Sequence, residues 1–288
     1  MCLMHMHLSR SSRGRRGLFE GRNVIVTGAS SGIGRDVAMM FAREGAKVAL
    51  FARRQRLLRR IADDIVNDGG IGIPFGCDVT DRMQVQRSVK QVEELFGGID
   101  VVVNSAGIAI PGRFYTSQVK DLRRMMEVNY FGTVNVIKAA LPVMLEARRA
   151  NIVNVASLAG RRAGANLSGY SASKFALIGF TEALRTELFG TRITASLVVP
   201  GTVDTSMLEN PEWQSTSWVL GNLKIPPAWV TCGVAVAVIV GLAEVEVPPG
   251  IATAQKIATL FPDLTAAWMG FGYMVVDLLG RWASPGLR

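Results

Sequence analysis

The feature that most constrains the fold is a regular alternation of short apolar runs, rich in valine and isoleucine, with longer amphipathic stretches. Runs without strict apolar–polar alternation are typical of strands covered on both faces. We expect strands at Asn23–Thr27, Lys47–Ala52, Ile71–Cys77, Ile99–Val103, Asn151–Ala156 and Ile193–Val199, with a short last one at Glu244–Val247. Helices are expected at Arg35–Glu44, Gln55–Asp68, Arg82–Phe96, Val119–Arg148 and Ser171–Phe189. The alternation predicts an α/β fold of βαβ units, with helices on both faces of a parallel sheet.

Composition excludes several classes of protein. Hydrophobic residues make up 49% of the 288 residues, which is ample for a buried core. The net charge is +9, but four arginines lie in the first sixteen residues and leave only +5 for the rest, so a nucleic-acid partner is not indicated. The cysteines, Cys2, Cys77 and Cys232, show no paired spacing, which argues against a disulfide framework and favours a reducing, cytoplasmic location.

Both histidines, His5 and His7, fall in the N-terminal tail. The body of the chain therefore has no imidazole for a Ser-His-Asp triad or for a histidine-ligated metal site. Acid–base chemistry has to come from Tyr, Lys, Asp, Glu or Ser, and we expect no metal site.

The sequence divides into a basic arm at residues 1–17, a catalytic domain at 18–250 and an apolar extension at 251–288. An electrostatic tether to anionic lipid is the alternative interpretation of the arm. Residues 225–243 carry no charge, but Pro226-Pro227 leaves too short a helix to span a bilayer, so we expect a helix buried against the sheet. The extension, with Trp268, Phe271 and Tyr273, could close the pocket, contact another subunit or rest peripherally on a membrane.

The first predicted strand leads into a glycine-rich turn, Thr27-Gly28-Ala29-Ser30-Ser31-Gly32-Ile33-Gly34, and then a helix. Glycines allow the backbone to approach a pyrophosphate, and the helix N-terminus offers free N–H groups and a positive dipole end. A strand before the turn and a helix after it are the context that a dinucleotide-binding motif requires, although a purely structural turn is the alternative.

The second predicted strand ends in Arg53-Arg54, with no acid between Glu44 and Asp63. In a dinucleotide fold an acid at this tip binds the ribose 2′-hydroxyl, whereas an arginine accommodates a 2′-phosphate. We therefore predict NADP(H) over NAD(H), with Arg53 as the principal contact and Arg54 assisting. A solvated helix start is the alternative.

Tyr170 and Lys174 stand four residues apart and so share one face of a helix. An ammonium near a phenol is expected to lower the tyrosine pKa, which suits the tyrosine to exchanging a proton with an alcohol or carbonyl oxygen. Ser157 follows a predicted strand and could hydrogen-bond the same substrate oxygen.

These motifs occur together with Asn104-Ser105-Ala106-Gly107, Asn129 and Pro200-Gly201-Thr202-Val203-Asp204-Thr205, in one order and at compatible spacings. In this combination residues 20–250 resemble the short-chain dehydrogenase/reductase family, in its short, non-extended branch. The resemblance implies a single Rossmann-type domain with a doubly wound parallel sheet of about seven strands.

The resemblance also assigns roles to matching positions. Tyr170 is the expected acid/base, Lys174 holds the nicotinamide ribose, Ser157 orients the carbonyl, and the carbonyl of Asn129 holds a water in the proton relay. The implied cofactor-binding residues are Gly28, Ser30, Gly32, Ile33, Gly34, Arg53, Arg54, Asp78, Val79, Asn104, Ala106, Gly107, Tyr170, Lys174, Pro200, Gly201, Val203 and Thr205. Ser105 departs from the family's more frequent asparagine.

We therefore expect an NADP(H)-dependent oxidoreductase that interconverts a carbonyl and an alcohol. A segment at 202–229 with Met207, Leu208, Trp213 and Trp218 is the expected substrate lid and favours an apolar substrate, such as a steroid, retinoid, fatty ketone or 3-oxoacyl chain. The alternatives are an NAD-dependent alcohol or hydroxysteroid dehydrogenase and a non-catalytic nucleotide sensor. Relatives commonly form dimers or tetramers, so a homodimer or homotetramer is expected.

Overall fold

A computed structural model describes residues 17–205, 224–258, 260–263, 265, 267, 270, 271 and 274. The basic arm to residue 16, the predicted lid residues Met207, Leu208, Trp213 and Trp218, and Trp268 and Tyr273 lie outside the described residues.

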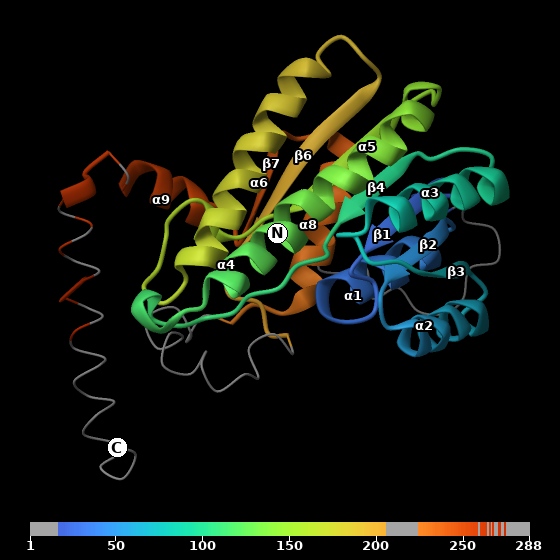
Figure 1. The fold of residues 1–288 in the computed structure, drawn as a ribbon. Helices are drawn as coiled ribbons and strands as arrows, with labels where there is room; N and C mark the ends of the chain where they lie inside the picture. The colour runs from blue at the N-terminus through green and yellow to red at the C-terminus, as the bar shows by residue number, and fades with distance from the viewer. Residues whose placement is uncertain are drawn as a thin grey trace.

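Seven parallel strands form one sheet in the order β3-β2-β1-β4-β5-β6-β7, as predicted (Figure 1). The strands are β1 (Asn23–Thr27), β2 (Lys47–Ala52), β3 (Ile71–Gly76), β4 (Val101–Asn104), β5 (Ala150–Val155), β6 (Ile193–Pro200) and β7 (Glu244–Val247). The strand order reverses between β1 and β4, and ligands of open α/β sheets bind at the carboxyl ends of the strands beside such a switch point.

Helices cover both faces of the sheet. The helices are α1 (Gly32–Arg43), α2 (Gln55–Asn67), α3 (Arg82–Phe96), α4 (Val119–Met126), α5 (Gly132–Leu145), α6 (Ser168–Glu187), α8 (Pro227–Val240) and α9 (Ile251–Ala258). Short helical turns are η1 (Phe114–Thr116), η2 (Glu127–Phe131) and η3 (Leu158–Gly160).

Alternate residues of one strand serve two cores. Val24 and Val26 of β1 pack with α1, α2 and α8, whereas Ile25 packs on the opposite face with α3, α5 and α6. This two-sided burial explains why the strands read as continuous apolar runs in the sequence.

Helix α8 lies buried against the sheet, as predicted for the uncharged stretch 225–243. Among the described residues, only Val119–Leu145 is both long and apolar enough to cross a membrane, judged by length and composition. Its α5 part packs on α3, β4 and β5 and so belongs to the covering layer of the sheet.

Candidate active site

The glycine turn lies between β1 and α1, at the switch point of the sheet. Gly28 has a φ of +68°, and a Cβ there would lie 2.8 Å from the Cα of Ala106. A Cβ at Gly34 would lie 2.5 Å from the carbonyl oxygen of Gly28. Only glycine therefore fits at either position. The turn opens into the N-terminus of α1, whose first turn carries no acidic residue and so leaves the positive end of the helix dipole uncompensated.

Two arginines at the end of β2 face this turn differently. The Arg54 guanidinium crosses to the turn, where Nη2 donates to Ser30 Oγ at 2.8 Å and to Ser31 Oγ at 2.6 Å. Arg53 reaches the other way, with Nη1 lying 3.9 Å from Asp78 Oδ2 and a side chain that is 55% exposed. Because exposed ion pairs contribute little, Arg53 keeps its cationic head available at the rim.

Polar side chains tie the carboxyl ends of the central strands together. Thr27 Oγ1 accepts hydrogen bonds from the amides of Ser105 and Ala106, each at 3.1 Å. The Asn104 amide nitrogen donates to Asn154 Oδ1 at 2.9 Å. The Asn104 Oδ1 atom is buried and has no hydrogen-bond partner among the described residues.

The segment after β3 forms the wall beyond the arginines. Asp78 Oδ1 accepts hydrogen bonds from the Thr80 amide at 3.0 Å and the Thr80 hydroxyl at 2.8 Å. Val79 packs against Gly132, where a Cβ would lie 2.6 Å from Val79 Cγ2, and its carbonyl accepts from Asn135 Nδ2 at 3.0 Å. Asp78 and Val79 both line the cleft beside the arginines, and their role in cofactor binding stays a prediction.

Ser157, Tyr170 and Lys174 come together where β5 ends beside α6. Lys174 Nζ donates to the carbonyl of Val155, the last residue of β5, at 2.9 Å and lies 5.8 Å from the centroid of the Tyr170 ring. Ser157 follows two residues after Val155, accepts a hydrogen bond from the Ala159 amide at 3.2 Å and hydrogen-bonds the Tyr170 side chain. The three predicted groups therefore share one location.

Burial shifts the pKa values of both ionisable groups. Desolvation raises the pKa of Tyr170, and the hydrogen bond with Ser157, which acts to lower that pKa, does not offset it. Desolvation also lowers the pKa of Lys174 from 10.5 to about 8. The prediction that Lys174 lowers the pKa of Tyr170 is therefore wrong in this structure, because withdrawal from water disfavours the charged form of each group.

Asn129 is completely buried in η2, a π-helical turn that interrupts the predicted helix between α4 and α5. Its amide nitrogen donates to the Ile108 carbonyl and to Ser173 Oγ, both at 2.9 Å, and its Oδ1 accepts from the Ile108 amide at 2.8 Å. A Cβ at Gly107 would lie 3.3 Å from Asn129 Oδ1 and 3.7 Å from Lys174 Nζ, so Asn129 and Lys174 flank the same space. Such π turns are frequent at functional sites.

One cleft of about 760 Å³ is lined by every predicted site residue except Asn104 and Asn129, which lie buried behind its wall. The glycine turn between β1 and α1 and the two arginines after β2 fit an extended dinucleotide. Two polar residues that the sequence analysis missed, Arg162 and Gln255, also line the cleft. Arg162 could have been noticed from its closeness to Ser157, whereas no local pattern marks Gln255.

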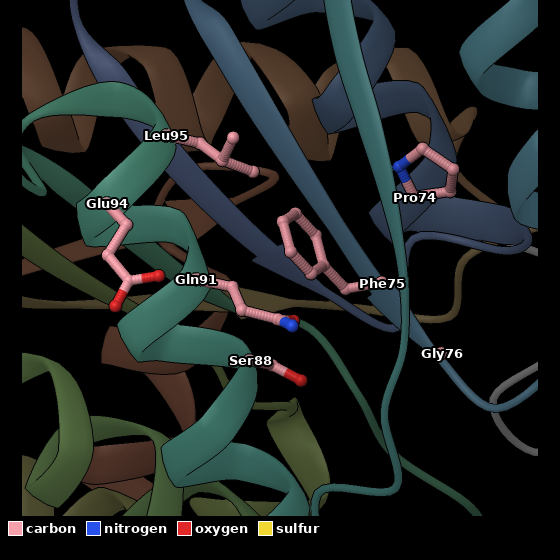
Figure 2. Close-up of a pocket in the computed structure, with 7 residues that line it drawn as sticks. All are labelled: Pro74, Phe75, Gly76, Ser88, Gln91, Glu94 and Leu95. Atoms are coloured by element: carbon pink, nitrogen blue, oxygen red, sulfur yellow. The ribbon is translucent and has the colours of Figure 1, made fainter.

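A second pocket of about 520 Å³ lies between β3 and α3. Figure 2 shows the Phe75 ring of β3 extending towards α3, with the Pro74 ring on the other side of the strand. The remaining lining residues are Gly76 of β3 and Ser88, Gln91, Glu94 and Leu95 of α3. None of the predicted site residues lines it, so the chemistry is assigned to the first cleft.

The sequence profile of the short chain dehydrogenase family matches residues 22–215. An oxidoreductase of Staphylococcus aureus (strain MRSA252), itself uncharacterised, is 37% identical over 183 residues, which are 64% of this chain and 78% of the relative. The ketoacyl reductase HetN of Nostoc is 38% identical over 183 residues, which are 64% of each chain.

Two solved structures share the fold. A short-chain dehydrogenase/reductase from Burkholderia phymatum, in complex with NAD, is 26% identical, with a TM-score of 0.77 over 86% of this chain and 96% of the other. A short-chain dehydrogenase from Burkholderia cenocepacia, in complex with NADP, is 31% identical, with a TM-score of 0.70 over 78% of this chain and 92% of the other. The two relatives carry different cofactors.

Proposed function

The chain belongs to the short-chain dehydrogenase family, whose members are oxidoreductases that bind a nicotinamide cofactor, and we propose that it is an NADP(H)-dependent enzyme interconverting a carbonyl and an alcohol. One observation carries this proposal. Ser157, Tyr170 and Lys174 line the same cleft as the glycine turn that fits a dinucleotide.

Each side chain has a defined task in this proposal. When bound, the nicotinamide ring supplies or accepts the hydride. The Tyr170 hydroxyl exchanges a proton with the substrate oxygen, and Ser157 orients that oxygen through its own hydroxyl. Lys174, fixed by its bond to the Val155 carbonyl, presents its remaining N–H groups to the ribose hydroxyls. The Asn129 carboxamide bonds to Ile108 and Ser173, and its main-chain carbonyl accepts from the Thr133 hydroxyl at 3.3 Å. A carbonyl has a second lone pair, which in this proposal holds the relay water that the family resemblance implies.

The preference for NADP(H) rests on the rim at the end of β2. Arg53 and Arg54 both line the cleft there, and Arg54 is held across the glycine turn by Ser30 and Ser31. A planar guanidinium suits bidentate binding of a 2′-phosphate. The alternative, NAD(H), is favoured by Asp78, an acid at this rim whose carboxylate lies 3.9 Å from the Arg53 guanidinium.

An apolar substrate is supported by the aliphatic residues of the cleft that also holds Ser157. Its lining includes Ile108, Ala109, Leu158 and Leu167, which offer no hydrogen-bonding side chains. The relative HetN bears the name of a ketoacyl reductase, which is compatible with a 3-oxoacyl substrate among the apolar carbonyl compounds.

The test is consumption of NADPH and of NADH by the purified protein across steroid, retinal, fatty-ketone and acyl-thioester panels, with Tyr170→Phe in parallel. We expect NADPH to be the better cofactor. Loss of the phenol is expected to reduce turnover by about 10²–10⁴-fold, the usual contribution of a general acid, while cofactor binding, followed by nicotinamide fluorescence, is kept.

Turnover by Tyr170→Phe close to that of the wild type would refute the assigned role of Tyr170. Binding of cofactor without turnover of any carbonyl or alcohol would instead support the non-catalytic sensor.

A further inference from the structure

Helix α9 forms a side wall of the cleft and is firmly attached to the sheet. Ala252 is fully buried in a cluster with Ala156, and Leu158 packs against that cluster. The Glu246 carboxylate accepts hydrogen bonds from the Ala252 amide at 3.1 Å and from the Thr253 hydroxyl. Ala156 and Leu158 are the two neighbours of Ser157 in the chain, so α9 sits directly against the turn that carries this residue.

The same attachment is reinforced by a largely buried carboxylate. Glu244 Oε2 lies 2.7 Å from Arg161 Nη2 and 2.9 Å from Lys256 Nζ. Arg161 directly follows η3, the turn that begins after Ser157, and it also pairs with Glu182 of α6 at 2.7 Å. Helix α9 and the turn after Ser157 are thus fixed to one shared anchor, which makes the direction of the α9 side chains well defined.

Gln255 lies three residues after Ala252, on the inner face of α9, and lines the cleft. Its Oε1 atom is buried and has no hydrogen-bond partner in the part of the chain that the structure describes. A buried carboxamide oxygen without a partner is costly, and a ligand that donates a hydrogen bond to it removes that cost. Leu158 and Leu167 of the same lining have no side-chain donor, and no donor of the described residues, Arg162 included, bonds to this oxygen.

Resting on the proposed function, we infer that Gln255 is a specificity-determining residue that selects carbonyl substrates bearing a second polar group with a donor hydrogen, either a hydroxyl or an amide N–H. The reactive carbonyl is held by Ser157 and Tyr170, and the body of the substrate lies on the apolar lining. The donor group, placed away from the reactive carbonyl, bonds to Gln255 Oε1. A plain hydrocarbon ketone leaves that oxygen unpartnered and is therefore the poorer substrate.

The experiment compares three ketones of equal chain length, one with a distal hydroxyl, one with a distal secondary amide and one with neither. We expect kcat/KM of the wild type to be about tenfold or more higher for at least one donor-bearing ketone, the scale set by one unpaired buried polar group. The hydroxyl and amide arms show which donor is selected. In Gln255→Leu the ratio is expected to fall to within about twofold of unity, chiefly through KM.

Two further variants serve as controls. Gln255→Glu keeps an acceptor oxygen and is expected to keep the preference. Gln91→Leu makes the same chemical change on α3, in the second pocket, and is expected to keep the wild-type ratio. Circular dichroism checks that each variant is folded, and titration with NADPH measures cofactor affinity separately.

Reduction of all three ketones at equal efficiency by the wild type would overturn the inference, as would a ratio that survives in Gln255→Leu. Weaker NADPH binding by Gln255→Leu with an unchanged ratio would also overturn it, because Gln255 would then face the cofactor. A protein that binds NADPH but reduces no carbonyl at all would refute the proposed function itself, which separates the two failures.

Discussion

Replacing Lys174 by methionine is expected to remove a specific dependence of folding stability on pH. The ammonium is withdrawn from water, which lowers its pKa from 10.5 to about 8, and its side chain is only 5% exposed. Because the folded pKa lies below the unfolded one, the unfolded chain binds more protons between these two values, and stability rises with pH across this range. The contribution is fully present above the unfolded pKa and is lost as the pH falls through the folded one.

The magnitude follows from the two pKa values. Each unit of pKa difference corresponds to about 1.4 kcal/mol. Integrated between about pH 7 and pH 9.5, the shift to about 8 gives a rise of roughly 2 kcal/mol in the free energy of unfolding. Tyr170 does not obscure this window, because burial raises its pKa above the ordinary value of 10.0.

The assay is urea denaturation of wild type and Lys174→Met at a series of pH values, at one protein concentration and without cofactor. Loss of the hydrogen bond to the Val155 carbonyl shifts the variant by a constant amount, so the signal is the pH dependence of the difference between the two proteins. Other titrating groups are common to both proteins and cancel. Parallel pH profiles for the two proteins would refute the argument that burial depresses this pKa.

Two other changes test the cofactor cradle. Gly28→Ala is expected to lower the free energy of unfolding by about 1–3 kcal/mol because of its φ of +68°, to lower it further through the clash with Ala106, and to abolish cofactor binding. Gly69 has a φ of +84°, and a Cβ there would meet no described atom within 4 Å. Gly69→Ala is therefore the control for backbone strain alone, measured by the same chemical denaturation. Arg53→Ala and Arg54→Ala are each expected to reduce kcat/KM for NADPH by about tenfold and to leave kcat/KM for NADH nearly unchanged. Equal losses with both cofactors in steady-state kinetics would contradict a 2′-phosphate site.

Much of this site could be predicted because its chemistry leaves local marks in the sequence. Gly28 and Gly34 have to be glycine, since a Cβ at either would overlap backbone atoms. Tyr170 and Lys174 need one helical turn between them, and Ser157 needs the end of a strand. These requirements act within a few residues of the chain. Each motif is common by itself, and it was their combination, with the family resemblance that it carries, that indicated residues which the structure brings to one cleft.

Two features escaped because they depend on packing between distant segments. The helix expected at Val119–Arg148 ran through the π turn at Glu127–Phe131, although the family resemblance marked Asn129 within it. The turn places Asn129 where its carboxamide bonds to Ile108 of the loop after β4. The pKa shifts of Tyr170 and Lys174 likewise depend on the depth of burial. Sequence spacing brought the two groups together correctly but could not tell that desolvation decides the direction of both pKa shifts.

Gln255 is the clearest example of a residue that the sequence analysis missed, because its position is set by ion pairs with other elements. Glu244 of β7 pairs with both Lys256 of α9 and Arg161 after η3. Helix α9 and the turn that carries Ser157 are therefore held by the same carboxylate. A change in the substrate wall is therefore coupled to the catalytic turn, whereas the glycine cradle lies on β1 and α1 and does not share this anchor. On this arrangement, substitutions in α9 are expected to alter substrate choice while leaving the geometry that binds the dinucleotide intact, which is how one fold can keep its cofactor site and change its substrate.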